Sequence, residues 1–266
     1  MTAIYLIFTV VVLISMGFVA QSVLIRARRR RLMALRLSDT QRASISRDFT
    51  TFTRLPDNLR DELEGLMHVF IHEKSFEACG DLELVTEHMQ HVIAAQACLL
   101  LVNRKHDFYR RLRSILLYPS AYKAENHHGG EDVRLGESWH SGSVILAWES
   151  VIAGGRNEED GHHVTIHEFA HQLDQVNGAA DGLPELSSAG SYREWAMVFG
   201  QAFDRFQKKL EKGHRTVIDP YGGTNPAEFF AVATETFYEK PKQLSEHYPQ
   251  VYQQLKSYYR VDPLQW

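Results

Sequence analysis

The sequence predicts an α+β protein: a single domain of helices with a small mixed sheet, preceded by one N-terminal transmembrane helix. Three observations favour this class. An uncharged apolar run fills residues 1–25, helical periodicity dominates residues 56–102, and short apolar runs at 114–119 and 142–151 have the length and β-branched content of strands. Because helices, strands and helices follow one another in blocks, a doubly wound parallel sheet is not expected.

Composition sets limits on the function. The 266 residues are 44% hydrophobic and 23% charged, which suits a chain with an ample core, and its two cysteines are too few for a disulfide framework. Cys79 and Cys98 are therefore expected to be buried thiols in a reducing compartment. The formal net charge of −4 hides six arginines in one segment without acids: Arg26, Arg28, Arg29, Arg30, Arg31 and Arg36. The remaining 23 basic and 33 acidic residues argue against binding to nucleic acid.

The apolar run at residues 1–25 is long enough to cross a bilayer, since about 20 residues at ~1.5 Å rise span its core. A cleaved signal peptide is the alternative, but it needs basic residues before the apolar run, and here they follow it. We therefore expect a retained single-pass anchor in the inner (cytoplasmic) membrane. The arginines place the rest of the chain in the cytoplasm and contact anionic lipid headgroups.

Residues 26–55 read as a basic juxtamembrane segment and a polar linker, and the folded domain is expected at residues 56–266. Within that domain, Pro56 starts a helix whose apolar residues recur at helical spacing. A second helix, over "TEHMQHVIAAQACLLLV", is apolar nearly all round and should be buried. Three histidines on these helices stand at isolated positions and are read as packing or surface residues: His72, His88 and His91.

The segment "VTIHEFAHQLDQ", residues 164–175, contains the pattern H-E-x-x-H. His167 and His171 lie four residues apart and so share one face of a helix, where both imidazoles can reach one metal ion. Glu168 lies at the edge of the same site and can accept a proton from an attacking water. Because this motif is short, the residues around it must decide between a peptidase site and a chance pair of histidines.

A catalytic zinc ion takes three protein ligands, so a third residue must come from elsewhere. Asp174 lies one turn beyond the two histidines and is expected not to bind metal but to support the ligands from behind or to support the structure. Glu228 stands in the first turn of a helix with Asn225 as its cap and Pro226 at its first position. That position favours Glu228, and Glu235, two turns later on the same face, is the second choice.

Several separated segments together resemble the Mlc titration factor A family of zinc-dependent peptidases. This gluzincin group has a catalytic core similar to that of anthrax lethal factor. The resemblance runs from about Pro56 to the C-terminal "DPLQW" and implies a single zincin-like peptidase domain. The segments that carry it are "IHEFAHQLD", "DPYGGTNPAEFFAVATETFYEKP", "GSVILAWESV" and "VTEHMQHVIAAQACLLL".

The resemblance also implies a role for each site residue. It implies one zinc ion per chain, bound by His167, His171 and Glu228, with Glu168 as the general base. It implies that Tyr221 donates its hydroxyl to the oxyanion formed during peptide hydrolysis. By the same analogy, "GSVILAWESV" is the edge strand along which an extended peptide substrate docks.

The chain departs from this family at its N-terminus. The best-known member is a soluble cytosolic protein that binds the glucose repressor Mlc, and the resemblance includes no counterpart to the apolar run at residues 1–25. Two hypotheses follow. The first is a membrane-anchored zinc peptidase that acts on peptide or protein substrates, as an aminopeptidase or an endopeptidase. The second is a regulatory protein that sequesters a transcriptional repressor and holds zinc structurally, which needs a fourth ligand such as His162 or His163. The presence of Glu168, which a structural site does not need, favours the first.

Overall fold

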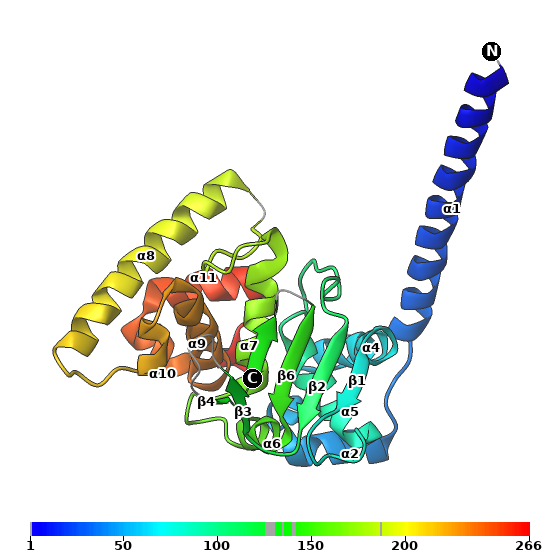
Figure 1. The fold of residues 1–266 in the computed structure, drawn as a ribbon. Helices are drawn as coiled ribbons and strands as arrows, with labels where there is room; N and C mark the ends of the chain where they lie inside the picture. The colour runs from blue at the N-terminus through cyan, green and yellow to red at the C-terminus, as the bar shows by residue number, and fades with distance from the viewer. Residues whose placement is uncertain (1, 126–130, 135, 140–141, 187) are drawn as a thin grey trace.

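A computed structural model describes residues 2–125, 131–134, 136–139, 142–186 and 188–266 of the chain. One long helix, α1, stands away from a body in which helices pack around a small mixed sheet (Figure 1). The predicted α+β class, with a single N-terminal helix long and apolar enough to cross a membrane, is confirmed.

Helix α1 runs without interruption from Thr2 to Met33, and the apolar side chains described in its N-terminal part are exposed. Its basic end is fixed to α4 (Asp57–Glu73), because Arg29 donates two hydrogen bonds of 2.8 Å to the Glu73 carboxylate. Gly65 of α4 allows the close approach: an added Cβ would lie 2.6 Å from the carbonyl oxygen of Met33. The helix therefore continues directly into the folded body.

The segment expected as a linker instead contributes to the core. It forms α2 (Asp39–Asp48), which begins at a capping box between Ser38 and Gln41, and the short α3 (Thr51–Arg54). Ile45, Phe49 and Phe52 are at most 1% exposed. These three apolar residues follow helical spacing, but the polar residues between them concealed the pattern. The packed body therefore begins well before residue 56.

The main sheet has four strands in the order β1 (Ser75–Ala78), β2 (Ser114–Tyr118), β6 (Ser143–Ala147) and β5 (Gly136–Trp139). Strands β1, β2 and β6 are parallel, and β5 is antiparallel to β6, so the predicted mixed sheet is confirmed. Strands β3 (Tyr122–Glu125) and β4 (Glu131–Arg134) form a separate antiparallel pair.

Two expectations for residues 142–151 were wrong. The strand ends at Ala147, and Trp148 begins α6 (Trp148–Arg156), because the apolar residues that follow have helical spacing. Strand β6 is also not an edge strand, since it pairs with β2 on one side and β5 on the other. Strand β5 is the sheet edge on that side.

The remaining helices enclose the sheet and complete the body. Helix α5 is buried along most of its length, as predicted, and Cys98 on it is fully buried, whereas Cys79 after β1 is partly exposed and both thiols are free. The helices are α5 (Glu87–Leu99), α7 (Val164–Asp174), α8 (Ala189–Glu211), α9 (Pro226–Glu239), α10 (Pro241–His247) and α11 (Pro249–Tyr259). Three 3-10 turns are η1 (Gln175–Asn177), η2 (Pro220–Gly223) and η3 (Pro263–Gln265).

Candidate metal centre

Helix α7 presents its two histidines to one point. The helix is capped by His163, whose Nδ1 accepts a hydrogen bond of 3.4 Å from the backbone N–H of Ile166. His167 and His171 lie one turn apart, with ring centroids separated by 4.7 Å and Nε2 atoms separated by 3.1 Å. Both rings thus turn the same nitrogen toward a common space, as the H-E-x-x-H spacing predicts.

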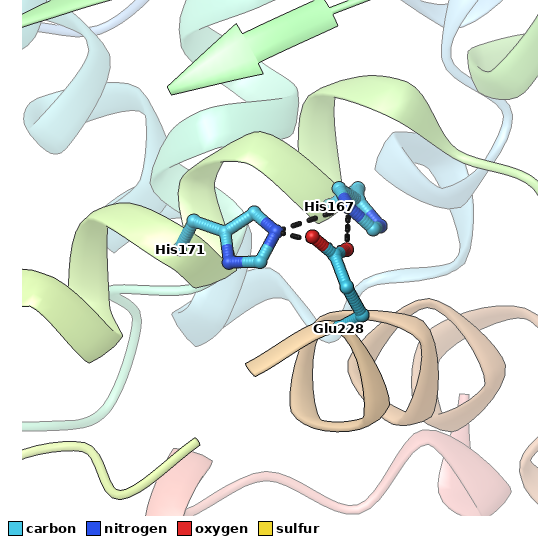
Figure 2. A group of neighbouring side chains, drawn as sticks. All are labelled: His167, His171 and Glu228. Atoms are coloured by element: carbon cyan, nitrogen blue, oxygen red, sulfur yellow. Dashed lines mark hydrogen bonds and ion pairs between the residues drawn. The ribbon is translucent and has the colours of Figure 1, made fainter. Parts of the chain in front are cut away.

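Glu228 meets these rings from a second helix (Figure 2). Asn225 caps α9 by accepting a hydrogen bond of 3.0 Å from the backbone N–H of Glu228, which fixes the first turn. Oε2 of Glu228 then lies 3.0 Å from Nε2 of His167 and 3.3 Å from Nε2 of His171. The structure therefore brings together the three residues that the sequence selected as candidate ligands.

The three facing atoms fit a zinc ion. Atoms bonded to tetrahedral zinc at about 2.0–2.1 Å lie about 3.3 Å from one another. The three separations here, 3.0, 3.1 and 3.3 Å, are close to that value. Two imidazole nitrogens and one carboxylate oxygen are also a usual ligand set for a catalytic zinc site. In the part of the chain that the structure describes, this is the one cluster of metal-ligating side chains with such spacing.

The electrostatics of the cluster favour a cation. Burial raises the pKa of Glu228, but hydrogen bonds from the two histidines outweigh it and lower this pKa to about 2. Burial lowers the pKa of His167, but the Glu235 and Glu228 carboxylates raise it well above its usual value. The carboxylates of Glu228 and Glu235 thus stabilise positive charge at His167. A metal ion bound at the cluster would supply that positive charge in place of the imidazole proton.

Glu235 lies behind the cluster. Its Oε1 is 2.7 Å from Nδ1 of His167, and its Oε2 accepts a hydrogen bond of 2.6 Å from the backbone N–H of His163. Because Nδ1 is the nitrogen opposite the cluster, Glu235 is placed to orient the His167 ring and not to close the ligand set. The two-turn spacing from Glu228 had made Glu235 a second candidate, but the spacing alone could not show which nitrogen it faces.

Asp174 supports the other end of α7, as the sequence suggested. Its carboxylate is buried, which raises its pKa to about 6, and accepts a hydrogen bond of 2.8 Å from the backbone N–H of Gly182. Gly182 has φ of +76°, and an added Cβ there would lie 2.4 Å from the carbonyl oxygen of Pro226. Asp174 therefore positions a loop against the first turn of α9, close to Glu228.

The two residues with implied catalytic roles differ in exposure. Glu168 is buried at 6% exposure beside His167, whereas Tyr221 is 55% exposed on the turn η2. The Tyr221 ring centroid lies 5.9 Å from that of His167. Asp219 fixes the turn, since its Oδ1 accepts a hydrogen bond of 2.8 Å from the backbone N–H of Tyr221. Its Oδ2 lies 3.4 Å from Nε2 of His162, an exposed residue just before α7.

His163, which the sequence offered as a possible fourth ligand, is buried and caps α7 instead. It is 2% exposed, and burial lowers its pKa to about 3, so its imidazole is neutral near pH 7. Its Nδ1 caps α7. Among the residues that the structure describes, His163 is not part of the cluster formed by His167, His171 and Glu228. The signal that could have identified it is its position directly before the apolar run of α7.

A mixed sheet, a helix with two metal-directed histidines and a second helix that supplies a glutamate together define a metallopeptidase-type protein. Comparison with known proteins agrees. The chain belongs to the family of glucose-regulated metallo-peptidases M90, whose model matches residues 24–260. The resemblance to Mlc titration factor A is thereby confirmed.

Relatives match over most of the chain. An uncharacterized protein of Synechocystis sp. is 40% identical over 222 residues, which cover 80% of each chain. Mlc titration factor A of Pectobacterium atrosepticum is 30% identical over 221 residues, 79% of this chain and 82% of the relative. Mlc titration factor A of Serratia proteamaculans is 31% identical over 192 residues, 68% and 72% of the two chains.

Proposed function

We propose that this chain is a zinc-dependent peptidase, anchored in the inner membrane by residues 1–25, with its catalytic body in the cytoplasm. The observation that carries the chemistry is the convergence of three ligand atoms, no more than 3.3 Å apart, from two separate helices. The M90 family supports the metallopeptidase class, and the donor set supports zinc.

His167, His171 and Glu228 would hold the ion. When bound, zinc supplies a Lewis acid that polarises the peptide carbonyl and lowers the pKa of a water to ~7. Glu235 holds a proton on Nδ1 of His167, which leaves the Nε2 lone pair directed into the cluster. The ligand geometry is therefore set by buried contacts before any substrate arrives.

Glu168 and Tyr221 are assigned to the reaction itself. Glu168 accepts a proton as water attacks the scissile carbonyl and delivers it to the leaving amine, which balances the hydrolysis. Tyr221 donates its hydroxyl to the negative charge that develops on the carbonyl oxygen. The exposure of Tyr221 and its nearness to His167 support this role. Strand β5, as the sheet edge nearest α7, is our candidate for the strand along which a peptide docks.

The orientation in the membrane rests on charge. The arginines of α1 follow its apolar part and fall within the last turns of the helix, so the positive-inside rule places the body in the cytoplasm. A reporter fused after Trp266 that works only in the cytoplasm should be active, and one that works only in the periplasm should be silent. The reverse pattern would contradict the proposed topology.

A regulatory function is the second candidate, because relatives carry the name Mlc titration factor A. In that case the chain binds a transcriptional regulator, and the zinc site is structural. A structural site needs a fourth protein ligand, and the cluster found among the described residues has three. The buried Glu168 beside His167 also favours catalysis.

One experiment separates the two candidates. Zinc content and hydrolysis of a peptide library are measured for the full chain and for Glu168→Gln and Glu228→Gln. Glu168→Gln should keep one zinc per chain and lose activity about a hundred- to ten-thousandfold, since the amide cannot accept the proton. Glu228→Gln should lose zinc. A chain without zinc, or a Glu168→Gln variant with full activity, would rule out the proposed peptidase.

A further inference from the structure

A second concentration of positive charge lies in the segment 103–113, between α5 and β2. It contains five basic residues and one acid, Asp107. Arg104 is turned inward, with its guanidinium 4.0 Å from the ring of Tyr258. The other four are exposed: Lys105, Arg110, Arg111 and Arg113. This charge is not part of the metal centre, and the N-terminal arginines are remote from it in sequence.

Buried contacts hold this segment in a defined shape. The Lys74 ammonium is buried and donates hydrogen bonds to the carbonyl oxygens of Tyr109, at 2.6 Å, and Leu112, at 2.9 Å. The backbone N–H of Asn103 donates to Glu62 at 3.0 Å. These contacts hold the backbone, and the cationic side chains of Lys105, Arg110, Arg111 and Arg113 lie on the outer surface.

The segment lies directly beside the basic end of α1. The guanidinium of Arg29 is 4.3 Å from the ring of Phe108, and the same group is hydrogen-bonded to Glu73. Figure 1 shows that the connection between α5 and β2 rises beyond the end of the sheet, on the side toward which α1 extends. The segment with these exposed cations therefore contacts the basic end of α1, where Arg26, Arg30 and Arg31 are exposed as well.

Most of these cations have no acidic partner in the described ranges. Nε of Arg110 lies 4.0 Å from Oδ2 of Asp107, and Arg111 donates a hydrogen bond of 3.0 Å to the backbone carbonyl of Gln175. No ion pair with Lys105 or Arg113 is found in those ranges. An exposed loop with several cations is usually only solvated, but Lys74 holds the backbone of this one, which also contacts α1, the helix proposed to cross the bilayer.

We propose that the segment 103–113 is a second membrane contact that takes the phosphate groups of anionic phospholipids. The proposal rests on the proposed membrane anchoring and adds a surface of the folded body to it. Charge complementarity selects the partner, because the inner leaflet is anionic and attracts each nearby Lys or Arg. A body with 33 acidic residues would otherwise be repelled from that leaflet.

Chemical footprinting of the full chain in vesicles tests the contact. The vesicles are phosphatidylcholine alone or phosphatidylcholine mixed with phosphatidylglycerol, and insertion is measured by flotation in high salt. The acetylation rate of Lys105 is measured by mass spectrometry, with the exposed Lys242 as reference. Lys105 should react at least about fivefold more slowly in the anionic vesicles, and salt should reverse the protection.

Two variants with the same change in charge provide the control. Arg110→Glu with Arg113→Glu should abolish the protection of Lys105, whereas Lys208→Glu with Lys212→Glu, on exposed positions near the end of α8, should leave it unchanged. Zinc content and circular dichroism establish that both variants fold. Protection that survives the first pair, or is lost equally with the second, would contradict a local contact.

The remaining outcomes separate this contact from the anchor. Equal Lys105 rates in both vesicles, with the chain inserted, would overturn the lipid contact and leave the anchor standing. Flotation with anionic vesicles alone, released by salt, would refute the anchor, and together with protection of Lys105 it would support the contact. Flotation with neither would refute both. Stronger protection of Lys105 by an RNA oligonucleotide than by phosphatidylglycerol would overturn the lipid assignment in favour of a nucleic acid.

Discussion

The two sides of the His167 ring differ in exposure: one side is buried among residues that hold the ring, and the other is open to solvent. Behind its Nδ1 atom lie Glu235 and His163, at 5% and 2% exposure, joined to each other by a hydrogen bond of 2.6 Å. On the other side stands Tyr221, at 55% exposure. The enclosed side fixes the ring in advance, and the open side leaves room for a substrate. Changes on the enclosed side should therefore affect metal binding and stability, and changes on the open side should affect turnover.

Between the two sides of His167, the larger effect on turnover is expected on the open side. Tyr221→Phe removes a donor to the oxyanion, so kcat and kcat/KM should fall together by about ten- to a thousandfold with zinc content unchanged. Steady-state kinetics and elemental analysis measure this. Full activity would mean that Tyr221 is structural, and a rise in KM alone would make it a substrate contact.

Gly182→Ala tests the enclosed framework at the other end of α7. A methyl group there meets the Pro226 carbonyl at 2.4 Å, and the positive φ is unfavourable for alanine. We expect a loss of about 2–3 kcal/mol in the free energy of unfolding and weaker zinc binding, because Glu228 is displaced with α9.

The matched control for Gly182 is Gly200→Ala in α8, where an added Cβ meets nothing within 4 Å. Since alanine is the better helix former, this variant should gain about 0.5–1 kcal/mol in denaturant unfolding. Equal behaviour of the two variants would show that the contact between Gly182 and α9 does not constrain the site.

Glu235→Gln tests the buried side of His167 directly. The amide keeps the shape but loses the charge that fixes the proton on Nδ1, so zinc affinity should fall about ten- to a hundredfold. At saturating zinc, kcat should change only a few-fold. Competition with a chelator measures the affinity. A loss of zinc as complete as that in Glu228→Gln would identify Glu235 as a ligand instead.

The smallest effect on the candidate site is expected for Glu239, one turn after Glu235 on α9. Burial raises the pKa of its carboxyl from its ordinary value to about 9, so the folded chain retains a proton that the unfolded chain releases above its lower pKa. Stability is thus lost as pH rises between these two pKa values. Glu239→Gln has no such proton and should gain about 1.4 kcal/mol relative to the natural chain per pH unit, for example from pH 5 to 6.

Unfolding at several pH values gives this difference, and activity at neutral pH should be unchanged. A constant difference between the two proteins would show that Glu239 ionises normally in the folded state.

The three candidate ligands could be predicted because each has a local signal. The four-residue spacing orients His167 and His171, and the Asn225 cap places Glu228 in the first turn of α9. The role of Glu235 could not be predicted, because it depends on how two helices distant in sequence cross. The sequence places Glu235 on the correct face but does not say which imidazole nitrogen it meets.

Elements were misread where the apolar signal was sparse or ambiguous. Helix α2 contributes few apolar residues, and its burial depends on contacts with elements far along the chain, such as Gly155, where an added Cβ would lie 2.1 Å from the Asp48 carbonyl oxygen. After β6, the apolar run continues past the strand, and the same residues serve a helix. Short apolar runs do not distinguish the two periods.

The unbroken course of α1 into the body has a consequence for reach. If residues 1–25 lie in the bilayer, as proposed, the helix continues by about 12 Å beyond it to Met33, where contacts with Gly65 and Glu73 fix it to α4. Because no flexible linker separates the helix from the body, the candidate metal centre would then stay at a nearly constant height above the lipid. The centre would then meet substrates only at one distance from the membrane surface. Selection among substrates would depend on how far from the membrane each presents its scissile bond.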